Sequence, residues 1–330
     1  MNFLLNAQSS SLDKTTFLKK ILAFFRLSRW ANLLFFALTQ WMFIYCIIDP
    51  IFNVSHIQPN IHGILIPLLL FSFVLVAAGG YIINDYFDLN IDQINKPDKV
   101  MIDKYISRRW AIFFHSLFSI ASVVIGVYID NKAEIHLLGI ANFIYGLLLF
   151  IYSLSLKKKL LAGNLLIAFL LAWVIIVITM CEGNQFILLG HHRIVNTQKL
   201  LRYTILYAGF AFVINLIREV VKDMEDVEGD RKYGCKTMPI VWGINSTKVF
   251  VAVWLVVLIS ILILLQFYAL QSQWWFFTIY CVIAVIAPLI KAFKKLSSAN
   301  SPKDYHEIST LIKIIMFTGI LSMVFFRIYE

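Results

Sequence analysis

Residues 64–95 read ILIPLLLFSFVLVAAGGYIINDYFDLNIDQIN, and this stretch decides the class of fold. Its first 20 residues, 64–83, contain no charged side chain. A helix of about 20 apolar residues, rising about 1.5 Å per residue, crosses the roughly 30 Å of hydrocarbon in a bilayer. The polar run 84–92 follows at once, so it is predicted to lie at the boundary between membrane and water.

The rest of the chain has the same apolar character. Of its 330 residues, 60% are hydrophobic and 15% are charged, which is far from the composition of a soluble domain. We therefore expect an all-α membrane protein in which nine transmembrane helices form one bundle around a central cavity. Residues 1–29 are expected to be a tail, and residues 30–330 a single domain. The expected spans are 30–48, 62–83, 110–129, 135–154, 162–181, 204–221, 248–266, 274–291 and 310–328.

Lysine and arginine gather in alternate loops. Of the 29, 23 fall on one predicted side of the membrane, 5 on the other, and Lys313 lies inside the ninth span. Because positive residues are retained in the cytoplasm, the N-terminus and the long charged loops are predicted to be cytoplasmic. The net charge of +10 thus reflects topology and does not indicate a nucleic-acid partner. We expect an integral protein of a bacterial inner membrane.

Other features argue against a secreted or zinc-binding protein. The first 20 residues lack the apolar core and cleavage site of a signal peptide, so they are expected to be a cytoplasmic tail. The four cysteines are scattered without a C-x-x-C pair, which favours buried apolar thiols over disulfides or zinc. The adjacent pair His191 and His192 has no acidic or cysteine neighbour, so it does not indicate a metal site.

A repeat of aspartates is the main sign of chemistry. Asp85, Asp88 and Asp92 stand at i, i+3 and i+7, and the same spacing returns 138 residues later in the trio Asp223, Asp226 and Asp230. At about 100° per residue, each trio is predicted to fall within about 60° of one helix face. Acidic residues commonly line solvated loops, but two matched trios on the same predicted side indicate a function.

Six carboxylates at one depth require a compensating cation. Each costs about 2.5–3.5 kcal/mol near the hydrocarbon, and like charges repel one another. Mg²⁺ joins one or two carboxylates to phosphate oxygens, so two facing trios predict a magnesium and diphosphate site. A transporter or lipid-binding protein is the alternative from another class, but it predicts charges within interrupted spans. A non-catalytic scaffold is a third reading, which the intact trios disfavour.

Two motifs resemble those of the UbiA-type intramembrane prenyltransferases. The first is N-D-x-x-D-x-x-x-D at 84–92, followed by Asn95-Lys96-Pro97, and the second runs from Arg218 to Asp230. The resemblance covers nearly the whole chain. It implies Mg²⁺-dependent transfer of a prenyl group from an allylic prenyl diphosphate to a lipid-soluble acceptor.

The resemblance also implies roles for individual residues. Asn84 and both aspartate trios would bind Mg²⁺ and the diphosphate. Many relatives have Arg-Pro where this chain has Asp98-Lys99-Val100, so Lys99 is a candidate replacement that lacks the bidentate contact of arginine. The remaining phosphate-binding candidates are Arg26, Asn32, Tyr152, Lys157, Arg218 and Lys222.

The acceptor is predicted from the second motif. Residues 218–230 most resemble the branch that includes digeranylgeranylglyceryl phosphate synthases. This favours a glycerol-phosphate lipid, such as geranylgeranylglyceryl phosphate, attacked through its hydroxyl oxygen. An aromatic acceptor of quinone biosynthesis remains the alternative within the same class of enzyme.

Overall fold

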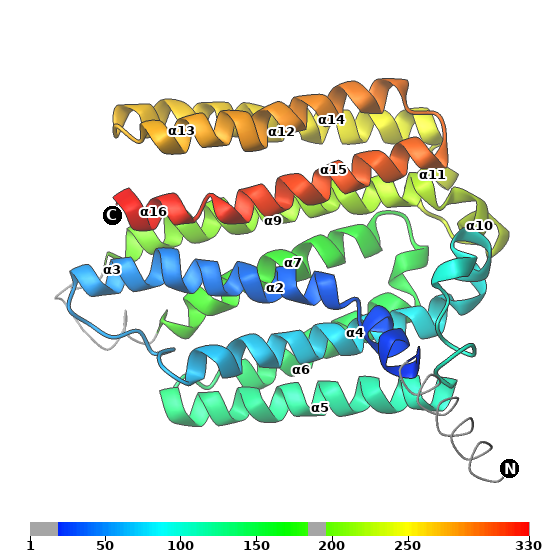
Figure 1. The fold of residues 1–330 in the computed structure, drawn as a ribbon, viewed down its shortest axis with the longest axis horizontal. Helices are drawn as coiled ribbons and strands as arrows, with labels where there is room; N and C mark the ends of the chain where they lie inside the picture. Colours follow the sequence, from blue (N-terminus) through cyan, green and yellow to red (C-terminus); the bar gives the residue numbers. More distant parts are fainter. Residues whose placement is uncertain (1–18, 184–195, 330) are drawn as a thin grey trace, which may run out of the picture.

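The computed structural model describes residues 19–183 and 196–329 of the chain. Within those ranges every regular element is a helix, apart from an isolated bridge between Ile102 and Ile106. Figure 1 shows the long helices lying side by side with their axes roughly parallel or antiparallel. The histidine pair His191 and His192 lies outside the described residues, so its environment stays unassigned.

The first half of the chain supplies six labelled helices. A π-helical turn, Ile44–Ile48, joins the first two of them into one longer rod. The helices are α2 (Trp30–Phe43), α3 (Asp49–Val54), α4 (Leu65–Asn95), α5 (Arg108–Ala133), α6 (Leu138–Leu154) and α7 (Ala162–Cys181).

The second half supplies eight more, several of them short. Another π-helical turn, Val282–Ile286, joins α13 to α14. The helices are α9 (Thr197–Glu225), α10 (Val227–Lys232), α11 (Met238–Val241), α12 (Ile244–Gln271), α13 (Trp275–Cys281), α14 (Ala287–Ser298), α15 (Pro302–Leu321) and α16 (Val324–Tyr329).

Most of these helices suit a bilayer. In the described part of the chain, 8 helical stretches are long and apolar enough to cross a membrane, and α6 is apolar but only 17 residues long. Large apolar side chains such as Ile120 on α5 and Leu264 on α12 are exposed on the outside of the bundle. Lipid is a favourable solvent for such faces, so the chain is an integral membrane protein. The count of nine spans and the orientation stay predictions.

Three groups of buried apolar side chains hold the helices together. The largest includes Phe43 and Phe73, and it joins α2 and α4 to α6, α7 and their neighbours. The second includes Ile217 and Leu255 and joins α9, α12 and α15. The third joins the helical residues 19–27 to α4. The described end of the expected tail therefore packs against the helix that carries the first aspartate trio.

The two aspartate trios are built differently. Helix α4 continues past the apolar run to Asn95, so the first trio lies on one helix, as its spacing predicts. The prediction that the second trio shares one helix face is wrong, because α9 ends at Glu225, Asp226 interrupts the helix, and α10 begins at Val227. The break brings the second motif against Asn95, whose side chain bonds backbone groups there.

Candidate active site

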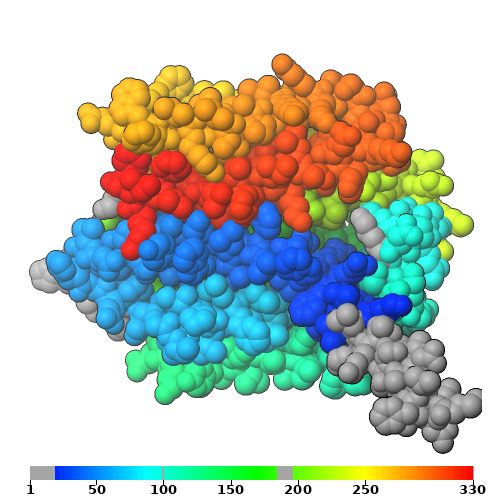
Figure 2. All heavy atoms as spheres, in the orientation of Figure 1, coloured from blue at the N-terminus to red at the C-terminus, as the bar shows by residue number. Residues whose placement is uncertain are grey.

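One cavity of about 750 Å³ gathers the residues that the sequence singled out. Its walls come from α2, α4, α6, α7, α9, α10 and α15. In the space-filling view, green atoms of the interior are seen in the recess between the blue, cyan and orange segments (Figure 2). Thirteen of the fourteen candidates line it: Arg26, Asn32, Asn84, Asp85, Asp88, Asp92, Tyr152, Lys157, Arg218, Lys222, Asp223, Asp226 and Asp230. The side chain of the fourteenth, Lys99, lies outside what the structure describes.

The first trio is held by cations from other helices. Arg29, just before α2, donates to Asp85 Oδ1 at 2.7 Å. Lys157, after α6, donates to Asp88 Oδ1, while Asn84 Nδ2 donates to Asp88 Oδ2 at 2.8 Å. Both carboxylates are thus neutralised by side chains distant in sequence.

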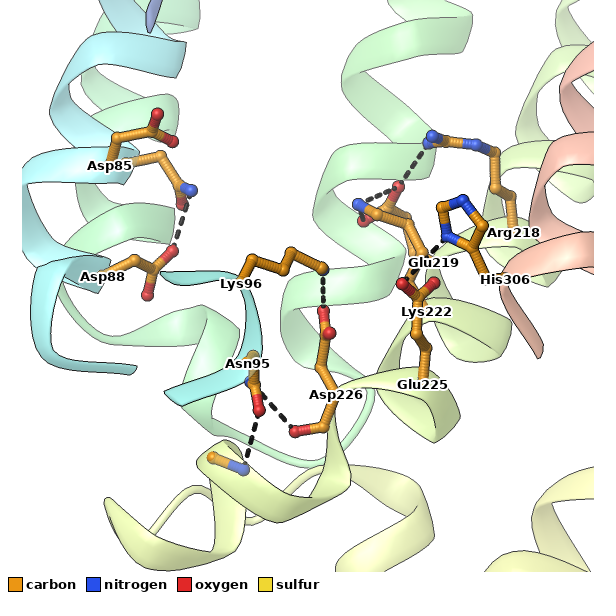
Figure 3. A network of polar contacts seen from close by, with 12 residues as sticks. Asp85, Asp88, Asn95, Lys96, Arg218, Glu219, Lys222, Glu225, Asp226 and His306 are labelled. Carbon is orange, nitrogen blue, oxygen red and sulfur yellow. Dashed lines mark hydrogen bonds and ion pairs between the residues drawn. The ribbon is translucent and has the colours of Figure 1, made fainter. Parts of the chain in front are cut away.

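The second trio is bonded to the first motif. Lys96, which follows α4 directly, donates to Asp226 Oδ2 at 2.6 Å (Figure 3). Asn95 Oδ1 accepts from the backbone N–H of Gly229 at 2.8 Å, and Asn95 Nδ2 donates to the Asp226 carbonyl at 3.1 Å. A Cβ on Gly229 would lie 2.4 Å from Asn95 Oδ1, so this close approach requires glycine. The two motifs therefore form one structure at the end of the bundle.

Two carboxylates in the cavity lack such a partner. Within the described residues, neither Asp92 nor Asp230 makes a hydrogen bond or ion pair through its side chain. Burial, together with the negative charges of Asp226 and Asp88, raises the pKa of Asp230 to about 7. Carboxylates from both motifs thus share one electrostatic environment that favours an added cation.

The donor set fits Mg²⁺. The six aspartates offer only oxygen ligands, which this ion prefers. In the described part of the chain no three acidic, histidine or cysteine side chains form a ready-made metal cage. Mg²⁺ takes one or two carboxylates and completes its octahedron with phosphate oxygens and water, so a few of these aspartates are enough to hold it.

A residue absent from the sequence-based candidates organises the far wall. Glu219 on α9 accepts from Arg218 Nη1 at 3.0 Å and from Lys222 Nζ at 3.1 Å (Figure 3). It thereby holds two cations beside the cavity. The sequence shows a run of charged residues after an apolar helix. No spacing within that run distinguishes Glu219, which holds Arg218 and Lys222, from the acids that could bind a metal.

A second residue absent from the candidates, Arg29, lies just before α2. The sequence pointed to Arg26, which is exposed and lines the cavity, whereas Arg29 makes the ion pair with the first trio. The Arg29 guanidinium also lies 5.0 Å from the centroid of the Tyr81 ring. Arg29 follows Arg26 by three residues, but its backbone is left-handed, with φ 52°, between the helical residues 19–27 and α2, so helix periodicity gave no signal for it.

Below the charged mouth the cavity becomes apolar. A second pocket, of about 110 Å³, shares Asn32, Tyr81 and Lys313 with the cavity and continues toward Met323. The aromatic residues that line one or both spaces, of which the sequence analysis had selected Tyr152, are Trp30, Phe35, Phe36, Tyr81, Tyr145, Tyr152, Tyr207 and Phe210. This shape suits a ligand with an anionic head and an apolar tail.

Comparison with known proteins supports the same reading. The model of the UbiA prenyltransferase family matches residues 52–317. The digeranylgeranylglyceryl phosphate synthase of Methanosphaera stadtmanae is 31% identical over 253 residues, which cover 76% of this chain and 83% of that protein. The synthase of the same name from Methanothermobacter thermautotrophicus is 38% identical over 188 residues, covering 56% of this chain and 59% of its own.

Solved structures share the fold. A structure described as digeranylgeranylglyceryl phosphate synthase in membranes gives a TM-score of 0.59 at 22% identity, covering 93% of this chain and 99% of its own. A UbiA homologue from Archaeoglobus fulgidus, described as bound to DMAPP and Mg²⁺, gives 0.53 at 16% identity, with 91% and 98% covered. The resemblance read from the two motifs is thus confirmed, and the chain belongs to the UbiA prenyltransferase family.

Proposed function

We propose that this prenyltransferase moves a prenyl group from an allylic prenyl diphosphate to the hydroxyl of a glycerol-phosphate lipid. The observation that carries the proposal is one cavity with two aspartate trios and their cations at its mouth and an apolar pocket at its floor. The UbiA homologue described as bound to DMAPP and Mg²⁺ shares the fold and supports this reading.

The two trios would hold Mg²⁺ together with the diphosphate. Among the residues that the structure describes, Asp92 and Asp230 have no competing side-chain partner, and the other four aspartates complete the acidic walls. When bound, Mg²⁺ stabilises the negative charge that develops on the departing diphosphate. Arg29, Lys96 and Lys157 now neutralise carboxylates, and each can turn its cationic group toward a phosphate oxygen as the carboxylates take other partners.

The rest of the chemistry falls to the cavity walls. The bond between the allylic carbon and the diphosphate oxygen breaks, and its electron pair leaves with the diphosphate. The acceptor's hydroxyl oxygen then bonds to that carbon and releases its proton. Aromatic faces of Tyr81, Tyr145 and Tyr152 can stabilise the positive charge on carbon, and the apolar walls exclude water that would compete with the acceptor.

The acceptor is assigned by similarity and by shape. The relatives above carry the name digeranylgeranylglyceryl phosphate synthase, and the first of them aligns with most of this chain. The continuous passage from polar mouth to apolar pocket fits a lipid whose polar end carries phosphate.

Purified protein supplied with labelled prenyl diphosphates tests the proposal directly. Each reaction would contain either geranylgeranylglyceryl phosphate or an aromatic acid, with Mg²⁺ or with a chelator, and mass spectrometry would identify the product. We expect a Mg²⁺-dependent ether product of the glycerol lipid. Prenylation of the aromatic acid alone would overturn the acceptor assignment, and metal-independent turnover would overturn the role of the trios.

We also propose that the active site faces the cytoplasm. The support is the distribution of lysine and arginine, 23 of 29 of which fall on the predicted cytoplasmic side with both motifs. A reporter fused to the C-terminus should be active only outside, and one inserted near Lys158 only in the cytoplasm. The reverse pattern would reject this orientation. The relatives named above are archaeal, so they lend no support to a bacterial membrane.

A further inference from the structure

Helix α15 carries a polar stripe into the cavity. His306, Thr310 and Lys313 stand at i, i+4 and i+7 and all line it. His306 pairs with Glu225 at 3.0 Å near the charged mouth (Figure 3). Lys313 is seven residues further along the helix, which places it about 10 Å deeper in the bundle. A lysine at that position inside a span is costly and requires a reason.

Two contacts of Lys313 stabilise its ammonium group. Its Nζ donates to Asn32 Oδ1 at 2.9 Å and lies 5.6 Å from the centroid of the Phe35 ring. Both contacts favour a cation. Among the described residues Lys313 forms no ion pair with a carboxylate, whereas Arg29, Lys96 and Lys157 each do. Lys313 is therefore available to an anion from outside the protein.

Neighbouring polar groups are also unsatisfied. Arg218 Nε and Asn215 Oδ1 are buried, and neither has a hydrogen-bond partner in the described residues. Arg218, Asn32 and Lys313 line both the charged cavity and the deeper apolar pocket. They therefore surround the neck between the two spaces, where the buried Arg218 Nε, a donor without a partner in the described residues, favours a ligand that carries acceptor oxygens.

We propose that Lys313, with Asn32 and Arg218, binds the phosphate of the acceptor lipid. The inference rests on the proposed function, in which two anionic groups must enter one cavity. The cations that pair with the trios serve the donor's diphosphate, so the acceptor's phosphate needs a separate positive site. Lys313 supplies it from α15, a helix that packs against α9 but carries no aspartate of either trio. Phosphate at the neck leaves the acceptor's chain in apolar surroundings and its hydroxyl inside the cavity.

Acceptor selectivity tests this assignment. Wild-type protein, Lys313→Gln and Lys313→Arg would be assayed with geranylgeranylglyceryl phosphate and with the same lipid lacking phosphate, and KM would be measured for donor and acceptor separately. Lys303→Gln is the control, because Lys303 is an exposed lysine on the same helix. Lys313→Met, neutral and suited to an apolar helix, replaces the glutamine variant if that protein is not recovered folded.

We expect Lys313→Gln to lower kcat/KM for the phosphorylated acceptor by about 10- to 100-fold, mainly through KM. The donor KM and the rate with the phosphate-free lipid should change little, and Lys313→Arg should retain most activity. Equal losses with both acceptors would show a structural role, and a raised donor KM would assign Lys313 to the diphosphate; either overturns the inference while the proposed function stands. Wild-type protein that prenylates neither lipid would overturn both.

Discussion

Both ends of the helical bundle hold carboxylates with little exposure, but the groups that bond them differ. At the end formed by α10 and the last turn of α4, the partners of Asp85, Asp88 and Asp226 are side-chain cations. At the opposite end, which Figure 1 shows beside α3, the buried acids Asp130 and Glu182 are bonded to backbone N–H groups instead.

The contacts at that opposite end connect the end of one helix to another segment of the chain. Asp130 Oδ1 accepts from the N–H groups of Leu137 and Leu138 at 3.0 and 2.8 Å, and Oδ2 accepts from Gly139 at 2.8 Å. The carboxylate thus satisfies the first N–H groups of α6, which have no partner within the helix. Glu182, fully buried, accepts from the backbone of Asn60 at 2.7 Å and so ties the end of α7 to the loop after α3.

The difference explains which acids can take part in chemistry. A backbone N–H is fixed by the fold, so a carboxylate bonded to it cannot change partner without local unfolding. A lysine or arginine side chain can swing away and leave its carboxylate to another cation. The charged end is therefore suited to exchange its ion pairs for a metal and a diphosphate, and the other end to hold the helices together.

The largest expected effect is on turnover at the charged end. Asp88→Ala and Asp226→Ala should each lower kcat by roughly 10³-fold or more, because the charge developing on the diphosphate loses its support. The folded fraction has to be measured beside the rate, because each change leaves one lysine, Lys157 or Lys96, without its carboxylate. Activity and size-exclusion profiles in detergent would be compared with Asp103→Ala, an exposed acid paired with Arg108. Near-native rates for the Asp88 variant would reject the two-motif mechanism.

The spacing of residues in the sequence predicts which side chains share a helix face, but not which residues of other helices they contact. The i, i+3, i+7 pattern of Asp85, Asp88 and Asp92 predicts a shared face, and α4 continues through all three. The partners of these acids were not predictable in the same way. Arg29 and Lys157 lie 56 and 69 residues from the aspartates they contact, and tertiary packing rather than periodicity sets such pairs.

The second motif shows where spacing fails. Its pattern matches the first, yet the helix breaks at Asp226, since the chain turns to meet Asn95. Asn95 lies 131 residues from Asp226 and 134 from Gly229, and one sequence cannot reveal that contact. The sequence shows Lys313 as a charge inside a predicted span. That it forms no ion pair with a carboxylate in the described residues depends on how the helices pack, and the sequence does not show it.

At the opposite end the expected effect is on stability. Asp130→Ala leaves three backbone N–H groups without an acceptor, and a cost of about 3 kcal/mol in the free energy of unfolding is expected. Thermal unfolding in detergent should show the loss, while the rate per folded molecule stays at the wild-type value. If Asp130→Ala has normal stability and a reduced kcat, the proposal that this end of the bundle serves stability and the charged end serves turnover is wrong.

The contact between the motifs gives an intermediate effect. Gly229→Ala would push its methyl group into Asn95 and displace the second motif, and a shift of about 1 Å can lower the rate by about 100-fold. Gly209→Ala is the matched control, since no heavy atom lies within 4 Å of its added Cβ on α9. That change should leave the rate unchanged and stabilise the helix slightly. Equal rates for the two alanine variants would show that the contact does not position the site.

The smallest expected effect is the pH dependence of stability at Glu182. Burial raises its pKa from the ordinary 4.5 to about 7, although the N–H groups of Asn60 and Ile61 act in the opposite direction. The folded chain therefore binds more protons than the unfolded chain between those values, so stability falls as pH rises through this window. The unfolding temperature should drop by about 2–5 °C across it. Glu182→Gln should remove that slope, and an unchanged slope would assign it to other groups.

The central claim is that the charged end exchanges its internal ion pairs for a metal and a diphosphate. The most direct test is the unfolding temperature with Mg²⁺, inorganic pyrophosphate, or both. We predict a rise in wild-type protein with both together that exceeds the sum of the separate effects, and its loss in Asp88→Ala and Asp226→Ala but not in Asp103→Ala. No joint rise in wild-type protein, or an equal rise in the Asp88 and Asp226 variants, would contradict the account.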